Sequence, residues 1–400
     1  MSTNLPSQSG KQHNLVSQRV NQIRPSGIRQ FFDLLASMEG VISLGIGEPD
    51  YTTPWHIREA AIYALEKGYT MYTSNLGMPE LRQELSRYLK NNYNLDYDPD
   101  GELLITVGVS EGLDLAMRAL LNPGDEVIMP DPCYVSYPAC VTLAGGTPVM
   151  VPTYQEDNFE ISPTDIEARV TNKTKIILIG YPANPTGAVM GKEKLLQIAE
   201  VARRHQLLVI YDEIYAKLVY GVKHTCFATL PGMKERTILL SGFSKAYAMT
   251  GWRIGYAAAN KEIIAAMTKI HQYTLLCAPI MTQIAAIEAL KSGEASTTEM
   301  VNDYNRRRLV MVKGLNEIGL PCFEPRGAFY AFPSIKSTGM TSREFSERLL
   351  LEEKVAVVPG TAFGQCGEGN VRCCYATSLA DIEEALSRMK RFADKHKKEG

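Results

Sequence analysis

Seven short apolar runs alternate with helical patterns between residues 103 and 259, and this alternation constrains the fold more than any other feature of the chain. The runs read LLITVG, EVIMP, TPVMVP, KIILIG, LLVIYDE, TILLSG and GYAAA. Several are almost continuously apolar, which is typical of strands buried on both faces of a sheet. Between them, residues 111–121 and 192–205 carry apolar side chains at helical spacings. The pattern predicts an open α/β core with helices packed on a mainly parallel sheet.

The pattern changes after residue 261 to long helical stretches, such as 295–318, and short strand-like pieces. These pieces read AFYAFP, KVAVVPG and NVRCCYA, and they predict a second, α+β domain. The segment before Thr53 has turn-forming residues at Pro25, Ser26 and Gly27 but no complete unit of its own. We therefore expect a large domain over residues 53–290 and a discontinuous small domain over residues 1–52 and 291–400.

The composition disfavours several classes of protein. With 42 Lys and Arg against 44 Asp and Glu, the chain has no cationic field for a nucleic-acid partner. No run of about 18 apolar residues occurs, and the first residues lack the apolar core of a secretory signal, so we expect a cytoplasmic protein without a membrane partner. The eight cysteines show no metal-ligand spacing, which predicts reduced thiols and no metal site.

Polar residues that directly follow the apolar runs are the candidates for a ligand site, because ligands of open α/β sheets bind at the carboxyl ends of the strands. VGVSEG joins a strand to a helix, and its small residues let backbone N–H groups approach an anion. YPANPTG places Asn184 between turn-forming residues. LLVIYDEIY ends a buried strand in Asp212 and Glu213, where a carboxylate is costly without a cationic partner.

A lysine and an arginine follow a later run, in the segment SGFSKAYAMTGWRIGY. Lys245 comes after the strand, and Arg253 lies eight residues further on. A lone lysine in such a place is usually a surface residue. Together with Asp212, Asn184 and Arg253, however, this lysine completes a set of residues that can hold pyridoxal phosphate. The lysine forms a Schiff base, the aspartate pairs with the pyridinium nitrogen and the arginine grips the phosphate bidentately.

With these motifs in order, the chain after about Gln22 resembles the class I aminotransferases of fold type I. It is most similar to the bacterial aromatic-amino-acid and N-acetyl-diaminopimelate aminotransferases. The resemblance is carried by PSGIRQFFDL, SLGIGEPDY, YTSNLGMPELR, NPTG, YDEIY, SGFSKAYAMTGWRIGY and NVRCCYATS, whose joint order and spacing are highly specific. It implies a pyridoxal 5'-phosphate (PLP) enzyme with a large and a small domain, working as a homodimer with shared active sites.

The resemblance also assigns residues around the cofactor ring. Lys245 matches the Schiff-base lysine, and Asp212 matches the partner of the pyridine nitrogen. Tyr215 and Asn184 match the donors to the phenolic oxygen of the ring. Tyr134 matches the aromatic residue that stacks on the ring, although an ordinary core tyrosine is the alternative.

Further matches concern the cofactor phosphate. Arg253 and Ser244 match phosphate ligands, together with the backbone at Val109 and Ser110. Ser241 stands one place away from the second serine position common in the family, which leaves its role open.

The remaining matches concern the substrate and the partner subunit. Arg372 matches the arginine that binds the substrate α-carboxylate, a planar fork suited to that group. Gly45 matches the glycine whose backbone approaches the same carboxylate, a plain turn glycine being the alternative, and Asn184 is expected to contact the substrate as well. Tyr72 matches the tyrosine that reaches the phosphate of the neighbouring subunit.

The expected reaction is a ping-pong transfer of an amino group to a 2-oxo acid, with 2-oxoglutarate as the acceptor. Some relatives place a lysine where this chain has the uncharged Ser110, and Ile28, Phe31 and Phe32 could cover a large side chain, which favours an aromatic or bulky donor. N-acetyl-diaminopimelate is the alternative donor.

Three other functions were weighed against the same residues. A carbon–sulfur β-lyase also begins by removing the substrate Cα proton on this fold, so it stays open. A non-enzymatic regulator lacks support, because no DNA-binding domain fits before Gln22 and the residues Lys245, Asp212 and Arg372 are present. A dinucleotide-binding dehydrogenase is disfavoured because no GxGxxG motif opens a helix.

Overall fold

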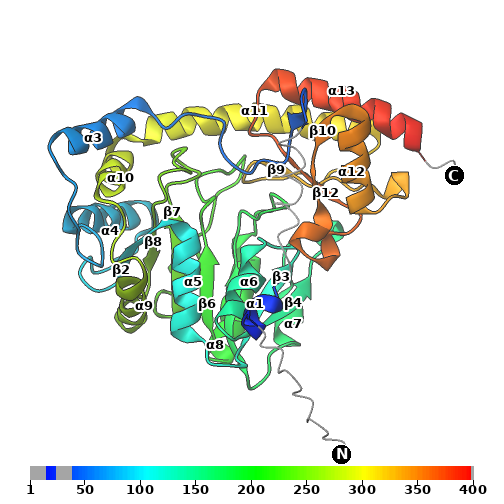
Figure 1. Ribbon diagram of the computed structural model, residues 1–400. Helices are drawn as coiled ribbons and strands as arrows, with labels where there is room; N and C mark the ends of the chain where they lie inside the picture. The colour runs from blue at the N-terminus through cyan, green and yellow to red at the C-terminus, as the bar shows by residue number, and fades with distance from the viewer. Residues whose placement is uncertain (1–14, 24–37, 398–400) are drawn as a thin grey trace, which may run out of the picture.

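The computed structural model describes residues 15–23 and 38–397. One seven-stranded sheet lies at its centre, and the long helix α11 crosses above it (Figure 1). The strands are β2 (Leu103–Thr106), β3 (Glu126–Asp131), β4 (Thr147–Pro152), β5 (Thr174–Ile179), β6 (Leu208–Asp212), β7 (Thr237–Gly242) and β8 (Gly255–Ala258). Each of the seven predicted apolar runs overlaps one of these strands, and the predicted fold class is confirmed.

The strand order in this sheet is β2-β8-β7-β6-β5-β3-β4. Strand β8 runs antiparallel to both of its neighbours, whereas β7, β6, β5, β3 and β4 pair in parallel. The carboxyl ends of the parallel strands therefore meet at one edge of the sheet, where the candidate residues follow them.

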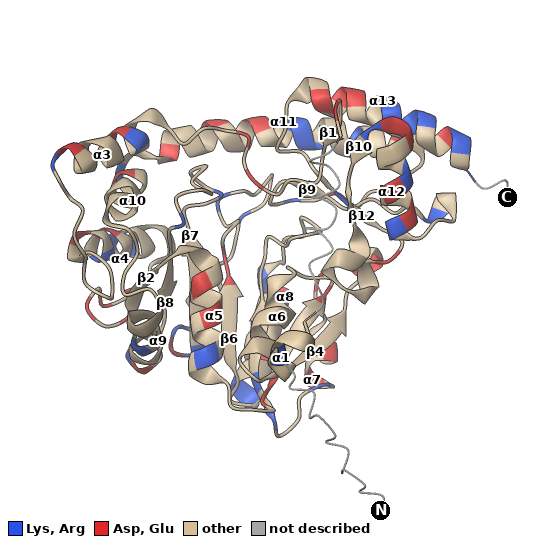
Figure 2. Cartoon of the chain, in the orientation of Figure 1, with Lys and Arg blue, Asp and Glu red and all other residues tan. Residues whose placement is uncertain are grey.

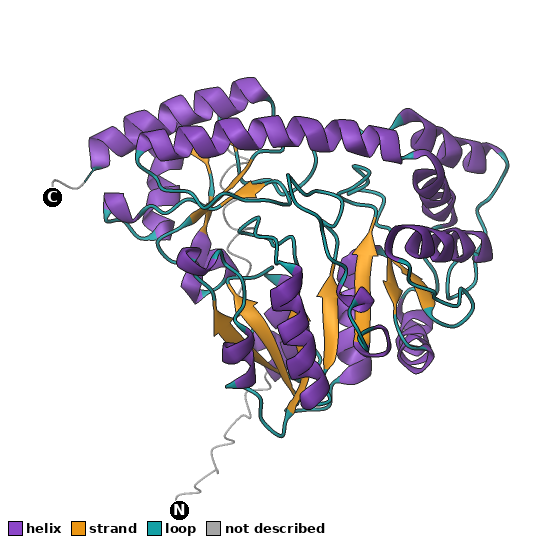
Figure 3. Cartoon of the chain, turned by 180° about the vertical axis from the view of Figure 1, so that it is seen from behind, coloured by secondary structure: helices purple, strands orange, loops and turns teal. Residues whose placement is uncertain are grey.

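Helices cover both faces of the sheet (Figures 1 and 3). The helices of the described ranges are α1 (Gln18–Asn21), α3 (Trp55–Glu66), α4 (Pro79–Tyr93), α5 (Gly108–Leu120), α6 (Ser136–Leu143), α7 (Pro163–Glu167), α8 (Lys192–Arg204), α9 (Lys261–Thr274), α10 (Ile280–Ser292), α11 (Glu294–Ile318), α12 (Ser342–Glu353) and α13 (Leu379–His396). The predicted helices 192–205 and 295–318 correspond to α8 and α11, and 111–121 corresponds to α5. Helix α5 begins earlier than predicted, at Gly108, and the Glu111 side chain accepts the backbone N–H of Val107 just before it.

The alternation of side chains along β6 decides which residues face the ligand edge. Val209 and Tyr211 pack in the apolar cluster that includes α8, whereas Ile210 packs in the cluster that includes α5. Because side chains alternate in a strand, Asp212 lies on the same face as Ile210, toward α5.

Short strands join distant parts of the chain beside the large sheet. Strand β1 (Ile42–Ser43) pairs in parallel with β10 (Val355–Ala356), and β12 (Val371–Cys374) lies between β11 (Val358–Pro359) and β9 (Tyr330–Ala331) in an antiparallel sheet. The pairing of β1 with β10 supports the grouping of the N-terminal segment with the C-terminal part, and we retain the two-domain division as a proposal.

Three further features of the chain are the charges on two helices, the apolar length of the helices and the extent of the described residues. Figure 2 shows Lys and Arg interspersed with Asp and Glu along α11 and α13. Within residues 15–23 and 38–397, no helix is long and apolar enough to cross a membrane. The expectations for the turn at Pro25, Ser26 and Gly27 and for Ile28, Phe31 and Phe32 lie outside the described residues.

Candidate active site

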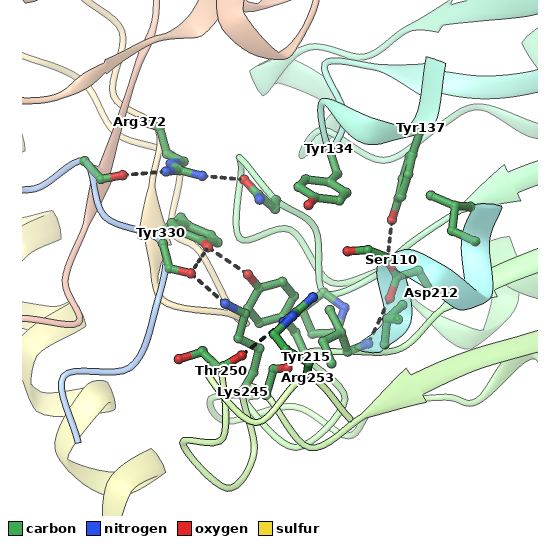
Figure 4. A pocket seen from close by; sticks show the side chains of 18 residues that line it. Ser110, Tyr134, Tyr137, Asp212, Tyr215, Lys245, Thr250, Arg253, Tyr330 and Arg372 are labelled. Carbon is green, nitrogen blue, oxygen red and sulfur yellow. Dashed lines mark hydrogen bonds between the residues drawn. The ribbon is translucent and has the colours of Figure 1, made fainter. Parts of the chain in front are cut away.

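A pocket of about 320 Å³ lies at the carboxyl edge of the large sheet, where the loops after its strands meet β9 and β12. Most of the predicted site residues line it, and Figure 4 shows the labelled ones converging on the same space. The predicted residues that line the pocket are Gly45, Val109, Ser110, Tyr134, Asn184, Asp212, Tyr215, Ser244, Lys245, Arg253 and Arg372. The structure thus brings together residues from segments that are up to 327 positions apart in sequence.

Asp212 is a buried carboxylate at the end of β6. Its Oδ2 accepts a hydrogen bond from the hydroxyl of Tyr137 at 2.9 Å, and its Oδ1 accepts the backbone N–H of Ile214 at 3.1 Å. Burial raises its pKa to about 6. The ion pairs of the described residues do not include Asp212, so the cationic partner that the sequence led us to expect is not supplied by this part of the chain. A protonated pyridine nitrogen is the kind of cation that fits here.

Lys245 lies in the loop after β7, and its amine is almost enclosed. The Nζ atom donates to the carbonyl oxygen of Gly47 at 2.6 Å and lies 5.9 Å from the ring centre of Tyr215. Burial lowers the pKa of Lys245 to about 8, and the charges of Arg372 and Arg253 act in the same direction. A lowered pKa increases the fraction of neutral amine, the form that attacks a carbonyl carbon or accepts a proton.

A pair of tyrosines stands beside this lysine. The hydroxyls of Tyr215 and Tyr330 lie 2.7 Å apart, and Tyr330 also donates to the Gly47 carbonyl at 3.4 Å. Burial holds the pKa of Tyr215 well above its ordinary value. Its hydroxyl therefore stays protonated and able to donate, as the role beside the phenolic oxygen of the cofactor requires.

Arg372 presents a planar fork to the pocket from β12. Its Nη1 donates to Asn184 Oδ1 at 2.9 Å and its Nη2 donates to the Gly45 carbonyl at 2.7 Å. The guanidinium lies over the ring of Tyr330 at 4.4 Å and that of Phe363 at 4.8 Å. Its Nε is buried and has no hydrogen-bond partner among the described residues. Among the described residues, its side-chain hydrogen bonds go to Asn184 and to the Gly45 carbonyl and none goes to a carboxylate, so the guanidinium can bind a substrate carboxylate.

The start of α5 forms a cradle for an anion. Gly108 has φ +76°, and a Cβ added there would lie 2.9 Å from Arg253 Nη2. The positive φ favours glycine at this position, and the guanidinium lies beside the start of the helix that Val109 and Ser110 continue. Ser244 also lines the pocket. Free N–H groups, a helix dipole and an arginine together suit a phosphate, so the cradle fits the cofactor that the resemblance implies.

The other predicted residues differ in whether they lie at the pocket. Tyr134 lines the pocket and meets the Tyr137 ring edge to face at 5.6 Å. Ser241 does not line the pocket, and its hydroxyl donates to the Glu213 carbonyl at 3.2 Å. Tyr72 is 80% exposed and lies outside the pocket, while Ile28 is outside the described residues.

Three residues with hydroxyl side chains line the pocket and were not predicted from the sequence. They are Tyr137, Thr250 and Tyr330. Tyr137 follows Tyr134 by three positions, a spacing that places both on one side of a helical turn and could have been noticed. Tyr330 belongs to the run AFYAFP, where a tyrosine is indistinguishable in sequence from a core aromatic residue. Thr250, whose hydroxyl donates to Glu48 at 3.0 Å, carries no signal that we recognise.

The lowered pKa of Lys245 makes a prediction for the apoenzyme. A neutral Lys245 amine would attack the aldehyde of the expected cofactor, so the rate of attachment should rise with pH through about 8 and level off above it. Stopped-flow absorbance on mixing apoenzyme with pyridoxal phosphate measures this rate, and free lysine gives the reference profile. A midpoint at the ordinary value of 10.5 would show that burial does not act on this amine in solution.

Comparison with known proteins agrees with this geometry. Residues 39–389 match the family model described as aminotransferase class I and II. A putative aminotransferase of Bacillus subtilis is 59% identical over 95% of this chain and 98% of its own length. An aspartate aminotransferase of Pyrococcus abyssi is 48% identical over 94% and 97%. The crystal structure of an aromatic aminotransferase from Pyrococcus horikoshii OT3 superposes with a TM-score of 0.88, at 46% identity, over 91% of this chain and 99% of that one.

Proposed function

Because the chain belongs to the class I and II aminotransferase family, whose cofactor is pyridoxal 5'-phosphate, we propose that it moves amino groups from aromatic or bulky amino acids to 2-oxoglutarate. It is an aminotransferase that acts on amino acids and 2-oxo acids. Relatives with similar identity are named for aspartate and for aromatic substrates, so family membership leaves the donor open.

The charge inventory of the pocket supports the choice of donor. Among the described lining residues the cations are Lys245, Arg253 and Arg372, and each has a proposed role. Position 110 is an uncharged serine. Thr250, which also lines the pocket, donates its hydroxyl to Glu48 and adds no positive charge. The short side-chain carboxylate of aspartate would therefore lose its hydration without gaining a cation. The longer 2-oxoglutarate can keep its distal carboxylate nearer the solvent.

The cofactor, when bound, supplies an aldehyde that links to amines and a protonated ring that withdraws electrons from the substrate Cα. Asp212 would keep the ring nitrogen protonated, and Tyr215 with Asn184 would hold the phenolic oxygen. Lys245 would bind the cofactor covalently until the substrate amine displaces it. Its freed Nζ would then take the proton from the substrate Cα and pass it to the cofactor carbon that had carried the lysine. Arg372 would orient the substrate through its α-carboxylate.

A donor panel tests this proposal. Steady-state kcat/KM should be measured for phenylalanine, tyrosine, N-acetyl-diaminopimelate and aspartate at one fixed 2-oxoglutarate concentration. We expect the aromatic donors to exceed aspartate by about tenfold or more, because one unpaired buried charge costs at least that factor. Ser110→Lys should shift the ratio toward aspartate, while Ser110→Ala should leave it unchanged. A wild-type preference for aspartate would contradict the argument from Ser110, and a preference for N-acetyl-diaminopimelate would select the alternative donor.

We also propose that the protein is a homodimer in which Tyr72 reaches the phosphate site of the partner subunit. The support is the resemblance together with the exposure of Tyr72, which is 80%, and of the nearby Met71 and Tyr69, which is 59% and 44%. Light scattering should give twice the chain mass of 44.3 kDa. Tyr72→Ala should weaken pyridoxal phosphate binding while the dimer persists. A monomer with full activity would contradict the proposal.

A further inference from the structure

A buried acid–histidine pair lies behind the phosphate cradle and touches none of the pocket. Nδ1 of His271, in α9, lies 2.6 Å from Oε1 of Glu111, in the first turn of α5. The His271 side chain is fully buried, and that of Glu111 is 10% exposed. Neither residue lines the pocket, although Glu111 directly follows Ser110.

The second oxygen of Glu111 holds the turn that leads into α5. Oε2 accepts the backbone N–H of Val107 at 2.5 Å, and Val107 itself provides no side-chain cap to the helix. Glu111, the fourth residue of the helix, thus accepts the N–H of the N-cap residue, a bond similar to the one that the third residue makes in a capping box. Its carboxylate fixes the backbone on the strand side of Gly108.

The opposite side of the same turn is fixed by close backbone packing. A Cβ added at Gly255 would lie 2.8 Å from the Gly108 carbonyl carbon and 2.8 Å from the Val109 nitrogen. The turn is therefore confined between β8 on one side and the Glu111 side chain on the other. These contacts, with the hydrogen bond that the Thr106 hydroxyl donates to the Gly108 carbonyl at 2.9 Å, restrict the positions of its N–H groups.

The role of His271 concerns the negative charge of the Glu111 carboxylate. A bare carboxylate in the first turn of α5 would repel an anion bound at the helix N-terminus, because a buried charge is poorly screened. A hydrogen bond from His271 Nδ1 compensates that carboxylate. With the proton on Nδ1, the buried Nε2, which has no partner in the described part of the chain, is a bare nitrogen and leaves no N–H unsatisfied.

We propose that Glu111 and His271 are positioning residues that hold the Val107–Ser110 turn in the shape that binds the cofactor phosphate. The inference rests on the proposed placement of that phosphate at Val109, Ser110 and Arg253. It extends the site to a pair of side chains that never touch the cofactor.

The test compares two probes that differ only in the phosphate, pyridoxal phosphate and pyridoxal. Their dissociation constants from the full-length apoenzyme are measured by absorbance titration. Glu111→Leu should weaken pyridoxal phosphate by about tenfold and pyridoxal little, because the loss is confined to the phosphate cradle. His271→Leu should do at least as much, since it leaves the Glu111 carboxylate uncompensated. Glu111→Gln, which can still accept the Val107 N–H, should restore most of the affinity.

Glu102→Gln is the matched control. Glu102 also accepts one backbone N–H, from Asp98 at 2.9 Å, and pairs with one cation, Lys234 at 3.2 Å, but it lies at the other end of β2. It should leave both dissociation constants unchanged. Equal weakening of the two probes by Glu111→Leu and His271→Leu, or no weakening, would overturn the proposal.

Arg253→Ala separates failure of this inference from failure of the proposed site. If Arg253→Ala selectively weakens pyridoxal phosphate and the Glu111 and His271 variants do not, the pair has no positioning role and the phosphate site stands. If Arg253→Ala shows no selectivity either, the phosphate does not bind at this cradle, and both proposals are wrong.

Discussion

Lys245→Ala should lower kcat for transamination by on the order of 10⁴-fold or more, because it removes the covalent link to the cofactor and the proton carrier together. The cofactor should still bind through the phosphate cradle, without the absorbance of a lysine-linked ring. Both quantities are measured on one sample, kcat by a coupled assay and linkage by the absorbance spectrum.

Lys175→Ala provides the matched control for this variant. Lys175 lies in β5 and pairs on the surface with Asp125 at 3.5 Å, away from the pocket. It should retain wild-type turnover and spectrum. Turnover near the wild-type rate in Lys245→Ala would show that another group carries the proton.

Asp212→Asn should slow the single-turnover reaction with an amino acid by on the order of 10²–10³-fold, because it removes the charge that would hold the ring nitrogen protonated. Asparagine preserves the shape of the side chain and can still accept the Tyr137 hydroxyl, whose distance to Asp212 is 2.9 Å. Asp212→Ala should be at least as slow. Rapid-mixing absorbance with saturating cofactor measures the rate.

Tyr137→Phe is the control that removes the hydrogen bond and keeps the charge. It should slow the same step by about tenfold or less, the usual effect of one hydrogen bond. If Asp212→Asn reacts at the wild-type rate, electrostatic control of the ring is not the role of this residue. If Tyr137→Phe is as slow as Asp212→Asn, orientation outweighs charge.

The large sheet could be predicted because its strands leave largely apolar runs in the sequence, and each of the seven runs overlaps one strand. The ligand edge followed from the position of Asp212 and Lys245 after two such runs. What the sequence could not show were pairings that depend on tertiary structure. The hydroxyls of Tyr215 and Tyr330 meet across 115 residues, and Glu111 meets His271 across 160.

The surroundings of Asp212 could not be predicted from the free-energy cost of burying a carboxylate alone. A buried carboxylate was expected to have a cationic partner, and the described residues offer it a tyrosine hydroxyl and a backbone N–H instead. The sequence shows where a strand ends but not which side chains an opposing helix turns toward it.

The position of Ser241 follows from the alternation of side chains along β7. Leu240 packs on the α5 face, so the next residue, Ser241, points away from the pocket.

The central claim is that an amino group passes to the enzyme and from there to a second oxo acid, and one half-reaction tests it most directly. The holoenzyme is mixed with excess phenylalanine, or with a cysteine conjugate, in the absence of any 2-oxo acid acceptor. The account predicts one equivalent of the corresponding 2-oxo acid per Lys245, no free ammonia, and renewed turnover only after 2-oxoglutarate is added. Continuous release of pyruvate and ammonia from the cysteine conjugate without an acceptor would contradict it and identify a carbon–sulfur β-lyase.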